Sequence, residues 1–294
     1  MTRHRRRSGS RSSASDNEDE AEIPIDREDD SSSDSELEIS FECHRPQPSD
    51  AQGIRLLLNG YLDKTAFPAG QLAMQVAEQE FVGSVVKVTD EEDVLGFLSC
   101  VNLGLFRSSE AGAAFASFLL SKCPANLHSF FDDLINSNVA NKTGLIIHER
   151  FFNIPPELGV PLWERMNEEL TWAVEDGVLE FDFDRFIYLS CVYTPKIDSV
   201  KVKGKKNKKK VAIPQFDCTP IYLKYEDEFF QKHSLHSFKF PSELGADKAS
   251  MFDFDVKAER LVLVLTREGI SNALKEAKKL VNDPREFELY DRSS

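Results

Sequence analysis

Residues 144–173 read Gly-Leu-Ile-Ile-His-Glu-Arg-Phe-Phe-Asn-Ile-Pro-Pro-Glu-Leu-Gly-Val-Pro-Leu-Trp-Glu-Arg-Met-Asn-Glu-Glu-Leu-Thr-Trp-Ala. The uninterrupted apolar run at 143–147 predicts a short buried strand. Apolar residues at helical spacing predict a helix from about 161 to 174. Between the two, Pro155 and Pro156 lack an N–H and restrict the residue before them, so we expect an extended crossing that forbids helix. The stretch therefore predicts a strand, a crossing segment and a helix.

The same two periods alternate on both sides of this stretch. Before it, we expect a strand near 37–41, helices around 54–61 and 68–81, strands at 83–88 and 97–102, and helices at 108–119 and 124–135. After it, we expect strands at 181–189, 237–240, 251–256 and 261–265, and a last helix over 269–281. Helices and strands that alternate in this way predict an α/β (α+β) fold, in which helices flank a mixed central β-sheet.

The two ends of the chain differ in composition from its middle. Residues 1–36 are mostly Arg, Ser, Asp and Glu, and such a segment cannot bury enough apolar surface to offset the entropy of ordering it. We expect a disordered tail there, basic and then acidic, and a second short tail over 285–294. Residues 37–284 are long enough to bury roughly three quarters of their surface, so we expect a single globular domain.

Charge is distributed unevenly along the chain. The 294 residues include 36 Lys and Arg against 50 Asp and Glu, which gives a formal net charge of −14. Residues 1–15 carry five Arg and no acid, whereas residues 16–42 carry thirteen acids and only Arg27. Residues 43–294 carry 30 basic and 37 acidic groups, and seven of the basic ones are lysines within 201–210. Without that run the rest of this segment stands at −14 rather than −7, so the predicted globule is more acidic than the net charge of its segment indicates.

The composition also excludes several classes of protein. Hydrophobic residues make up 41% of the chain, and 22 of them are Phe, which indicates a globular protein with an aromatic core. No apolar run approaches the roughly 18 residues of a membrane helix, and no secretory signal precedes residue 40, so we expect neither membrane insertion nor export by that route. The five cysteines form no CxxC pair, and we expect them to be reduced core residues.

Motifs of the common enzyme classes are missing from the sequence. It contains no GxGxxG, GxxxxGK[ST], GxSxG or HExxH pattern, so the signatures of dinucleotide, P-loop, hydrolase and zinc sites are absent. Cys43-His44 and His233-x-x-His236 lack further ligands at metal spacing, and we interpret them as solvated or structural. We expect no catalytic residue, no cofactor and no metal.

Two pairs of carboxylates are each spaced two residues apart in expected strands, and hence on one face. They are Asp182 with Asp184 and Asp253 with Asp255. One interpretation makes them acid–base or divalent-metal groups, although the sequence shows no further oxygen ligands. A second makes them the wet faces of outer strands, where charge discourages edge-to-edge pairing. In a third, they form an acidic docking face for a basic partner.

A lysine-rich loop is expected at about 195–214. Its like charges repel one another and cannot be buried unpaired, so the segment should be extended and accessible. It could be a solvated loop, a nuclear-import signal or a phosphate-binding patch, but it lacks the aromatic readers that are typical of nucleic-acid binding. We favour an import signal with Arg3–Arg7 as a second candidate, and its lysines are Lys201, Lys203, Lys205, Lys206, Lys208, Lys209 and Lys210.

Several blocks of the sequence resemble the BCCIP/Bcp family, whose animal members are nuclear proteins named for binding a breast-cancer tumour suppressor and a cyclin-dependent-kinase inhibitor. The main block runs from Gly144 to Leu158 and continues to Ala173. Three further blocks are similar to the family's "GSV-K" strand, "GF-S--NL" strand and "-EDE-F" segment; they are Gly83–Lys87, Phe97–Leu103 and Tyr225–Phe230. The resemblance covers nearly everything from about residue 38 to 282.

The resemblance also marks signature residues, for which we expect a structural role. These are Glu149, Arg150, Asn153, Pro155, Pro156, Pro161 and Leu162. Pro161 is expected at the first position of its helix. The family implies a fold similar to the GNAT acetyltransferases, which hold coenzyme A on a [RQ]xxGx[GA] turn at a helix start. The corresponding segment here is Gly104–Ser109, which lacks that pattern, so we expect no acetyl transfer.

The function implied by the resemblance is protein binding. Fungal members imply a nuclear chaperone for a large-subunit ribosomal protein and a role in nuclear export of a lipid kinase. Because an acidic surface attracts basic ribosomal proteins, we expect a non-catalytic nuclear chaperone or adaptor that shuttles to the cytoplasm with import and export factors. The alternative is a cell-cycle and DNA-repair adaptor that binds a cyclin-dependent-kinase inhibitor and a tumour suppressor. A GNAT-type acyltransferase is the third hypothesis, and no direct, specific nucleic-acid binding is expected.

Overall fold

The computed structural model describes residues 39–196, 220–243 and 255–283. The strands are β1 (Phe41–His44), β2 (Gly83–Val88), β3 (Gly96–Asn102), β4 (Thr143–Arg150), β5 (Arg185–Pro195), β6 (Ile221–Tyr222), β7 (His236–Pro241) and β8 (Val256–Leu265). The α-helices are α1 (Ala51–Leu57), α2 (Ala69–Glu78), α3 (Leu103–Phe106), α4 (Glu110–Lys122), α5 (Ala125–Asn136), α6 (Gly159–Glu175), α7 (Glu226–Lys232) and α9 (Arg267–Val281). The predicted tails, and the lysine-rich loop from residue 197 on, lie outside the described residues.

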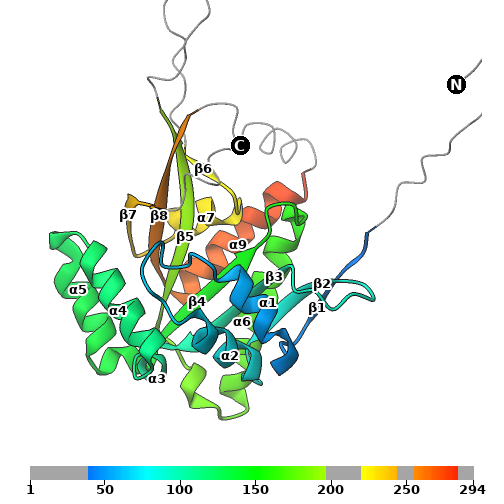
Figure 1. The fold of residues 1–294 in the computed structure, drawn as a ribbon, viewed down its shortest axis with the longest axis horizontal. Helices are drawn as coiled ribbons and strands as arrows, with labels where there is room; N and C mark the ends of the chain where they lie inside the picture. The colour runs from blue at the N-terminus through cyan, green and yellow to red at the C-terminus, as the bar shows by residue number, and fades with distance from the viewer. Residues whose placement is uncertain (1–38, 197–219, 244–254, 284–294) are drawn as a thin grey trace, which may run out of the picture. The chain divides into compact units, whose positions relative to one another are not determined.

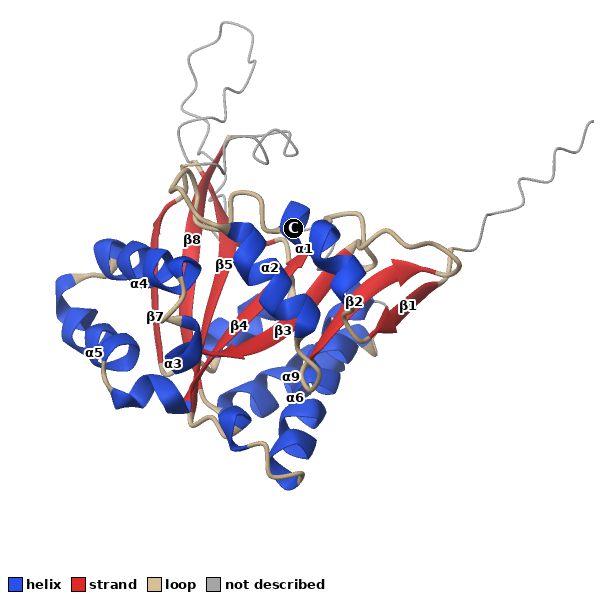
Figure 2. Ribbon diagram, turned by 60° about the horizontal axis from the view of Figure 1, so that its bottom comes forward, coloured by secondary structure: helices blue, strands red, loops and turns tan. Residues whose placement is uncertain are grey.

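One mixed sheet organises the described part of the chain (Figures 1 and 2). Its strand order is β1-β2-β3-β4-β5-β8-β7, and β6 pairs with the end of β5. The pair β4 and β5 is parallel, and the other paired strands are antiparallel. The predicted α/β architecture with a mixed central sheet is confirmed.

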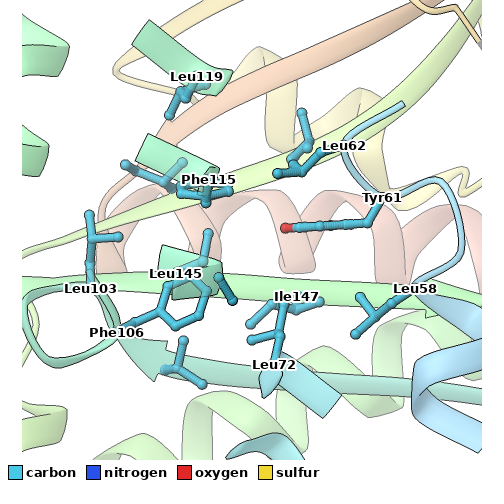
Figure 3. Packing of buried hydrophobic residues seen from close by; sticks show 14 of the residues in the cluster. Leu58, Tyr61, Leu62, Leu72, Leu103, Phe106, Phe115, Leu119, Leu145 and Ile147 are labelled. Atoms are coloured by element: carbon cyan, nitrogen blue, oxygen red, sulfur yellow. The ribbon is translucent and has the colours of Figure 1, made fainter. Parts of the chain in front are cut away.

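Side chains of the central strands alternate between two apolar cores, because successive residues of a strand point to opposite faces. Leu145 and Ile147 pack with residues of α1, α2, α4 and α5 in one core, part of which Figure 3 shows. Ile146, between them, packs with residues of α6, α7 and α9 in the other core. Each face of the sheet is therefore covered by its own set of helices.

Local signals fix several helix ends where the sequence predicts them. The side chains of Ser109 and Thr266 accept the backbone N–H of Gly112 and Gly269 at the starts of α4 and α9, both at 3.0 Å. After α6, Gly177 adopts a φ of +83°, and its N–H and that of the next residue bond back to the last turn of the helix. This arrangement is a Schellman motif, which terminates the helix.

The expected strand over 181–189 begins four residues later than predicted, as β5 at Arg185. Residues 179–181 form a 3-10 turn, and the alternating Phe181 and Phe183 are both buried in the same core, with ring centroids 6.1 Å apart. The strand also lies in the middle of the sheet, between β4 and β8, so it is not the outer strand considered as one interpretation of Asp182 and Asp184. The alternation of Phe and Asp over 181–184 therefore reflects a turn that buries two aromatic rings in the same core, and not a strand.

Other differences concern short or merged elements. The strand expected at 261–265 extends back to Val256 as the single strand β8, and residues 251–254 lie outside the described ranges. The strand expected at 37–41 begins at Phe41. The one-turn helix α3, the two-residue strand β6 and helix α7 were not predicted; α3 and β6 are too short to show a period. No described helix combines the length and apolar character needed to cross a bilayer.

Candidate functional site

The main signature block begins at the centre of the sheet, in β4, and runs through a 3-10 turn into α6. This strand pairs antiparallel with β3, so that Glu149 faces Phe97 and Arg150 faces Gly96. Because side chains alternate along a strand, the adjacent Glu149 and Arg150 project to opposite faces. Arg150 projects toward α7, whose first residue is Glu226.

Arg150 and Glu226 form a buried, bidentate ion pair. The Arg150 Nη1 atom lies 2.8 Å from Glu226 Oε1, and Nη2 lies 3.1 Å from Oε2. The exposed fractions of the two side chains are 5% and 0%. Burial alone would lower the pKa of Arg150, but the charge of Glu226 and its hydrogen bonds raise that pKa, so the guanidinium stays charged. The pair joins the main signature block to the "-EDE-F" block.

Asp227, the next residue, is also fully buried. Its carboxylate accepts a hydrogen bond from the Tyr188 hydroxyl at 2.9 Å and a second one from the Ser190 hydroxyl. Burial, together with the neighbouring Glu226, raises the pKa of Asp227 to about 6, although Lys224 opposes the shift. The ammonium group of Lys224 donates to the carbonyl of His148 at 2.6 Å and lies 5.3 Å from the ring centroid of Tyr188.

His148 completes this signature cluster, which we define as His148, Arg150, Lys224, Glu226 and Asp227. Its ring is fully buried, and neither nitrogen has a hydrogen-bond partner within the described ranges. Burial, and then the charges of Lys224 and Arg150, hold the pKa of His148 well below its usual value. The imidazole is therefore neutral at physiological pH.

The signature cluster is enclosed by protein. The start of α6 covers the Glu226 carboxylate so tightly that a Cβ added to Gly159 would lie 2.8 Å from it. The positive end of the helix dipole faces the carboxylate there, which adds to its stabilisation. Glu226, Asp227 and His148 have no exposed surface. A substrate has no access to these groups, and the buried ion pair with Glu226 fits the expected structural role of Arg150. Glu149 projects to the other face and is not part of this cluster.

The prolines of the stretch differ from the prediction. Pro155 is extended, but Pro156 begins a 3-10 turn that leads into α6, so the extended crossing does not continue to the helix start predicted at about 161. Helix α6 begins at Gly159, which places Pro161 at the third helical position rather than the first. That position is tolerated because the first-turn N–H groups have no intrahelical acceptor. Asn153 is exposed and Leu162 is buried.

The candidate docking acids do not form one surface. Asp182 and Asp184 precede β5, so their predicted place on a strand is wrong, and Asp182 is paired with Lys142. Asp255 is exposed immediately before β8. Because β5 and β8 run antiparallel over ten residue pairs, a ladder about 30 Å long at 3.3 Å per residue, Asp184 and Asp255 lie beyond its opposite ends. Asp253 lies outside the described residues.

The segment matched to the coenzyme A turn is packed against protein. Asn102 caps α3 by accepting the N–H of Leu105 at 3.2 Å. A Cβ at Gly104 would collide with Asn141, and one at Gly112 would collide with the carbonyl of Phe106. These glycines therefore serve close packing rather than an open phosphate loop. The seven lysines from Lys201 to Lys210 lie outside the described residues.

A family model of BCCIP matches residues 36–230 of the chain. The chain belongs to the BCCIP family. Both Arg150 and Glu226 fall within the matched range, so the ion pair at the centre of the signature cluster connects two parts of the BCCIP region.

Named relatives and a solved structure agree with this. The chain is 29% identical over 208 residues to "Protein BCCIP homolog" of Arabidopsis thaliana, a match that covers 68% of this chain and 62%, less than two thirds, of that protein. It is 24% identical to the "BRCA2 and CDKN1A-interacting protein" of Bos taurus, with 82% of each chain covered. The crystal structure of BCP1 from Saccharomyces cerevisiae has a TM-score of 0.59 at 19% identity and covers 90% of this chain and 97% of its own, which shows a shared fold.

The acetyltransferase comparison is much weaker. An N-acetyltransferase structure matches with a TM-score of 0.33 and 10% identity. This level of similarity carries no argument about activity.

Sequence reasoning did find the arginine of the signature cluster, but missed its carboxylate partners. The available signal was the Glu226-Asp227 pair between Tyr225 and the apolar Phe229-Phe230.

Proposed function

We propose that this BCCIP-family chain is a non-catalytic nuclear chaperone or adaptor that binds a basic ribosomal protein in large-subunit biogenesis and acts in nuclear protein export. One observation carries the proposal: exposed acidic residues of the described ranges outnumber exposed basic ones by two to one. Buried basic side chains such as Arg150 and Arg260 form ion pairs inside the fold and add no charge to the surface. A surface of this charge attracts a basic protein at long range and shields it from RNA.

The main test is recovery of partners from nuclear extract on the immobilised full chain. At low salt, mass spectrometry of the eluate should identify a basic ribosomal protein of the large subunit, and its recovery should fall as the salt concentration rises, because salt screens surface charge. Recovery of no basic ribosomal protein at any salt concentration would refute the chaperone proposal.

A second candidate function is that of a cell-cycle and DNA-repair adaptor. It is favoured by the name of the relative from Bos taurus, "BRCA2 and CDKN1A-interacting protein". In the same experiment, recovery of a cyclin-dependent-kinase inhibitor or of a tumour suppressor without ribosomal proteins would favour this adaptor. Recovery of a lipid kinase together with export factors would favour the transport role.

The competing class is an acyltransferase, and a thermal-shift titration with acetyl-coenzyme A tests it. A ligand present at 100 times its dissociation constant stabilises a folded protein by about 2.7 kcal/mol. We expect no shift in melting temperature, because Gly104 and Gly112 are packed against protein. A shift that disappears when Gly104–Ser109 is altered would refute the non-catalytic proposal.

A further inference from the structure

Two clefts meet at an exposed aromatic residue where the chain passes from α2 to β2. The first, of about 670 Å³, is lined by residues of α2, by Phe81 and by Glu180 and Phe181. The second, of about 620 Å³, is lined by residues of α6 together with Phe81. Glu80 and Phe81 belong to both linings. The two clefts therefore adjoin at Glu80 and Phe81, and we call the pair of clefts the Phe81 groove.

Large apolar side chains in this groove are exposed to solvent. Trp172 on α6 is 57% exposed, Met74 on α2 is 43% exposed and Phe81 is 39% exposed. Exposed apolar clusters of this kind on a soluble protein are typical of binding sites, and Trp is enriched among the residues that dominate binding energy. The groove therefore has the apolar anchors of a docking surface.

The rim of the groove is acidic. Five exposed carboxylates line it, and none has an ion pair among the described residues; they are Glu78, Glu80, Glu168, Asp176 and Glu180. Arg45, also in the lining, has no ion pair with any residue that the structure describes, whereas Arg165 is bound by Glu169 at 2.9 Å and by the carbonyl of Cys43 at 3.1 Å. The groove thus offers an excess of unpaired negative charge around exposed aromatic rings.

The segment that carries Phe81 is held firmly in place on both sides. Before it, the amide of Gln79 donates to the Ser99 hydroxyl at 2.7 Å. After it, the N–H of Gly83 donates to the buried Glu169 at 2.9 Å. The ring itself lies 6.0 Å from that of Phe181. Because these contacts hold the wall of the groove in place before binding, little binding free energy would be lost to ordering that wall when a ligand binds.

We propose that the Phe81 groove binds a Lys/Arg-rich segment of a basic protein partner. Carboxylates on the rim would pair with its ammonium and guanidinium groups, and the faces of Trp172 and Phe81 would take cationic or apolar side chains, since cations bind favourably over aromatic rings. Charge complementarity selects this occupant, because nucleic acid would be repelled by the same rim. The inference rests on the proposed function and names the surface and the segment chemistry for it.

The test measures the affinity of a fluorescein-labelled 14-residue peptide in which Lys and Arg alternate with Leu and Ala. Two variants of the full chain probe the groove: Trp172→Ala with Phe81→Ala, and Glu80→Gln with Asp176→Asn. We expect each to weaken binding at least tenfold, and the second variant to reduce the salt dependence of binding as well. Because these side chains are exposed, melting temperatures should stay close to that of the unchanged protein.

Matched controls test whether a loss of affinity is specific to the groove, or whether removing two acids or an exposed aromatic residue anywhere on the surface has the same effect. The turn 90–93 contains four exposed acids but no exposed large apolar residue, so Glu91→Gln with Asp93→Asn makes the same charge change elsewhere. Phe152→Ala removes an aromatic residue that is 71% exposed beyond the end of β4. Both controls should change affinity less than twofold. Equal losses from groove and turn variants would overturn the proposal, as would equal binding of a peptide with Gln in place of Lys and Arg.

Tryptophan fluorescence gives an independent readout. The chain has two Trp residues, and Trp163 is fully buried, so acrylamide quenching reports mainly on Trp172. Saturating peptide should protect this fluorescence, and unchanged quenching would contradict binding in the groove. If groove variants still recover ribosomal proteins from nuclear extract as well as the unchanged protein does, the groove inference fails while the proposed function stands. If the groove binds the peptide but extract yields no ribosomal protein, the proposed function fails instead.

Discussion

Replacing Arg150 by Met should destabilise the protein severely, because it leaves the Glu226 carboxylate buried without a counter-charge. The exposed fractions of the two side chains are 5% and 0%, and two hydrogen bonds of 2.8 and 3.1 Å are lost. Removal of one partner from a pair of this kind costs about 3–5 kcal/mol. That is a large share of the roughly 5–15 kcal/mol that keeps a domain folded.

The double variant Arg150→Met with Glu226→Met tests whether the unpaired charge causes the loss. Replacing both members of a buried pair by apolar residues is often close to neutral, so we expect the double variant to be more stable than Arg150→Met alone. Lys142→Met is the surface control: Lys142 and its partner Asp182 are 47% and 45% exposed, and loss of such a pair costs about 1 kcal/mol or less.

Urea unfolding of the three variants, followed by fluorescence and circular dichroism, measures these differences. Trp163 is fully buried and its ring centroid lies 4.1 Å from that of Phe230 in α7, so its emission reports directly on the packing of α7. A loss below about 1 kcal/mol for Arg150→Met, or a double variant less stable than the single one, would refute the argument from an uncompensated buried charge.

Two further predictions rest on buried contacts near Glu226, and a third rests on the charge of the lysine run. Burial raises the pKa of Asp227 to about 6, so the folded state holds this proton more tightly than the unfolded chain. The stability of the unchanged protein relative to Asp227→Asn should therefore fall as pH rises from about 4 to 6, because buried His148, whose lowered pKa gives the opposite trend, is present in both proteins and cancels in the difference; a difference that does not change with pH would contradict this assignment. Gly159→Ala should lower the free energy of unfolding by about 1–3 kcal/mol, because the added methyl group would press on the Glu226 carboxylate. The control Gly70→Ala, in an open helical position, should raise the free energy of unfolding by about 0.5–1 kcal/mol. Equal denaturation midpoints for the two variants would contradict the packing argument. Replacing the seven lysines of 201–210 by Gln should leave the melting temperature unchanged while it reduces nuclear accumulation of a fluorescent fusion; full accumulation would assign import to Arg3–Arg7 or to a partner.

Several elements of the fold were predictable because their signals are local. A buried strand at 143–147, a helix ended by Gly177 and a helix begun by Ser109 depend on residues within one or two turns of each other. Phe181 and Phe183 misled the prediction because alternation in a short segment does not distinguish a strand from a turn that buries two rings in one core. The period indicates which side chains are buried, but it does not by itself define the backbone that buries them.

The sequence by itself determined the α/β class, most helix and strand positions, and the acidic character of the chain, since each follows from local periodicity or from counting charges. Only the tertiary structure decided which distant residues meet. Glu226 lies 76 residues from Arg150 along the chain, and Trp172 of α6 and Phe81, from the connection between α2 and β2, line one cleft although 91 residues separate them. The physical reason is that such meetings depend on strand order and crossing direction. These are set by the packing of the whole core, and no short stretch of sequence encodes them.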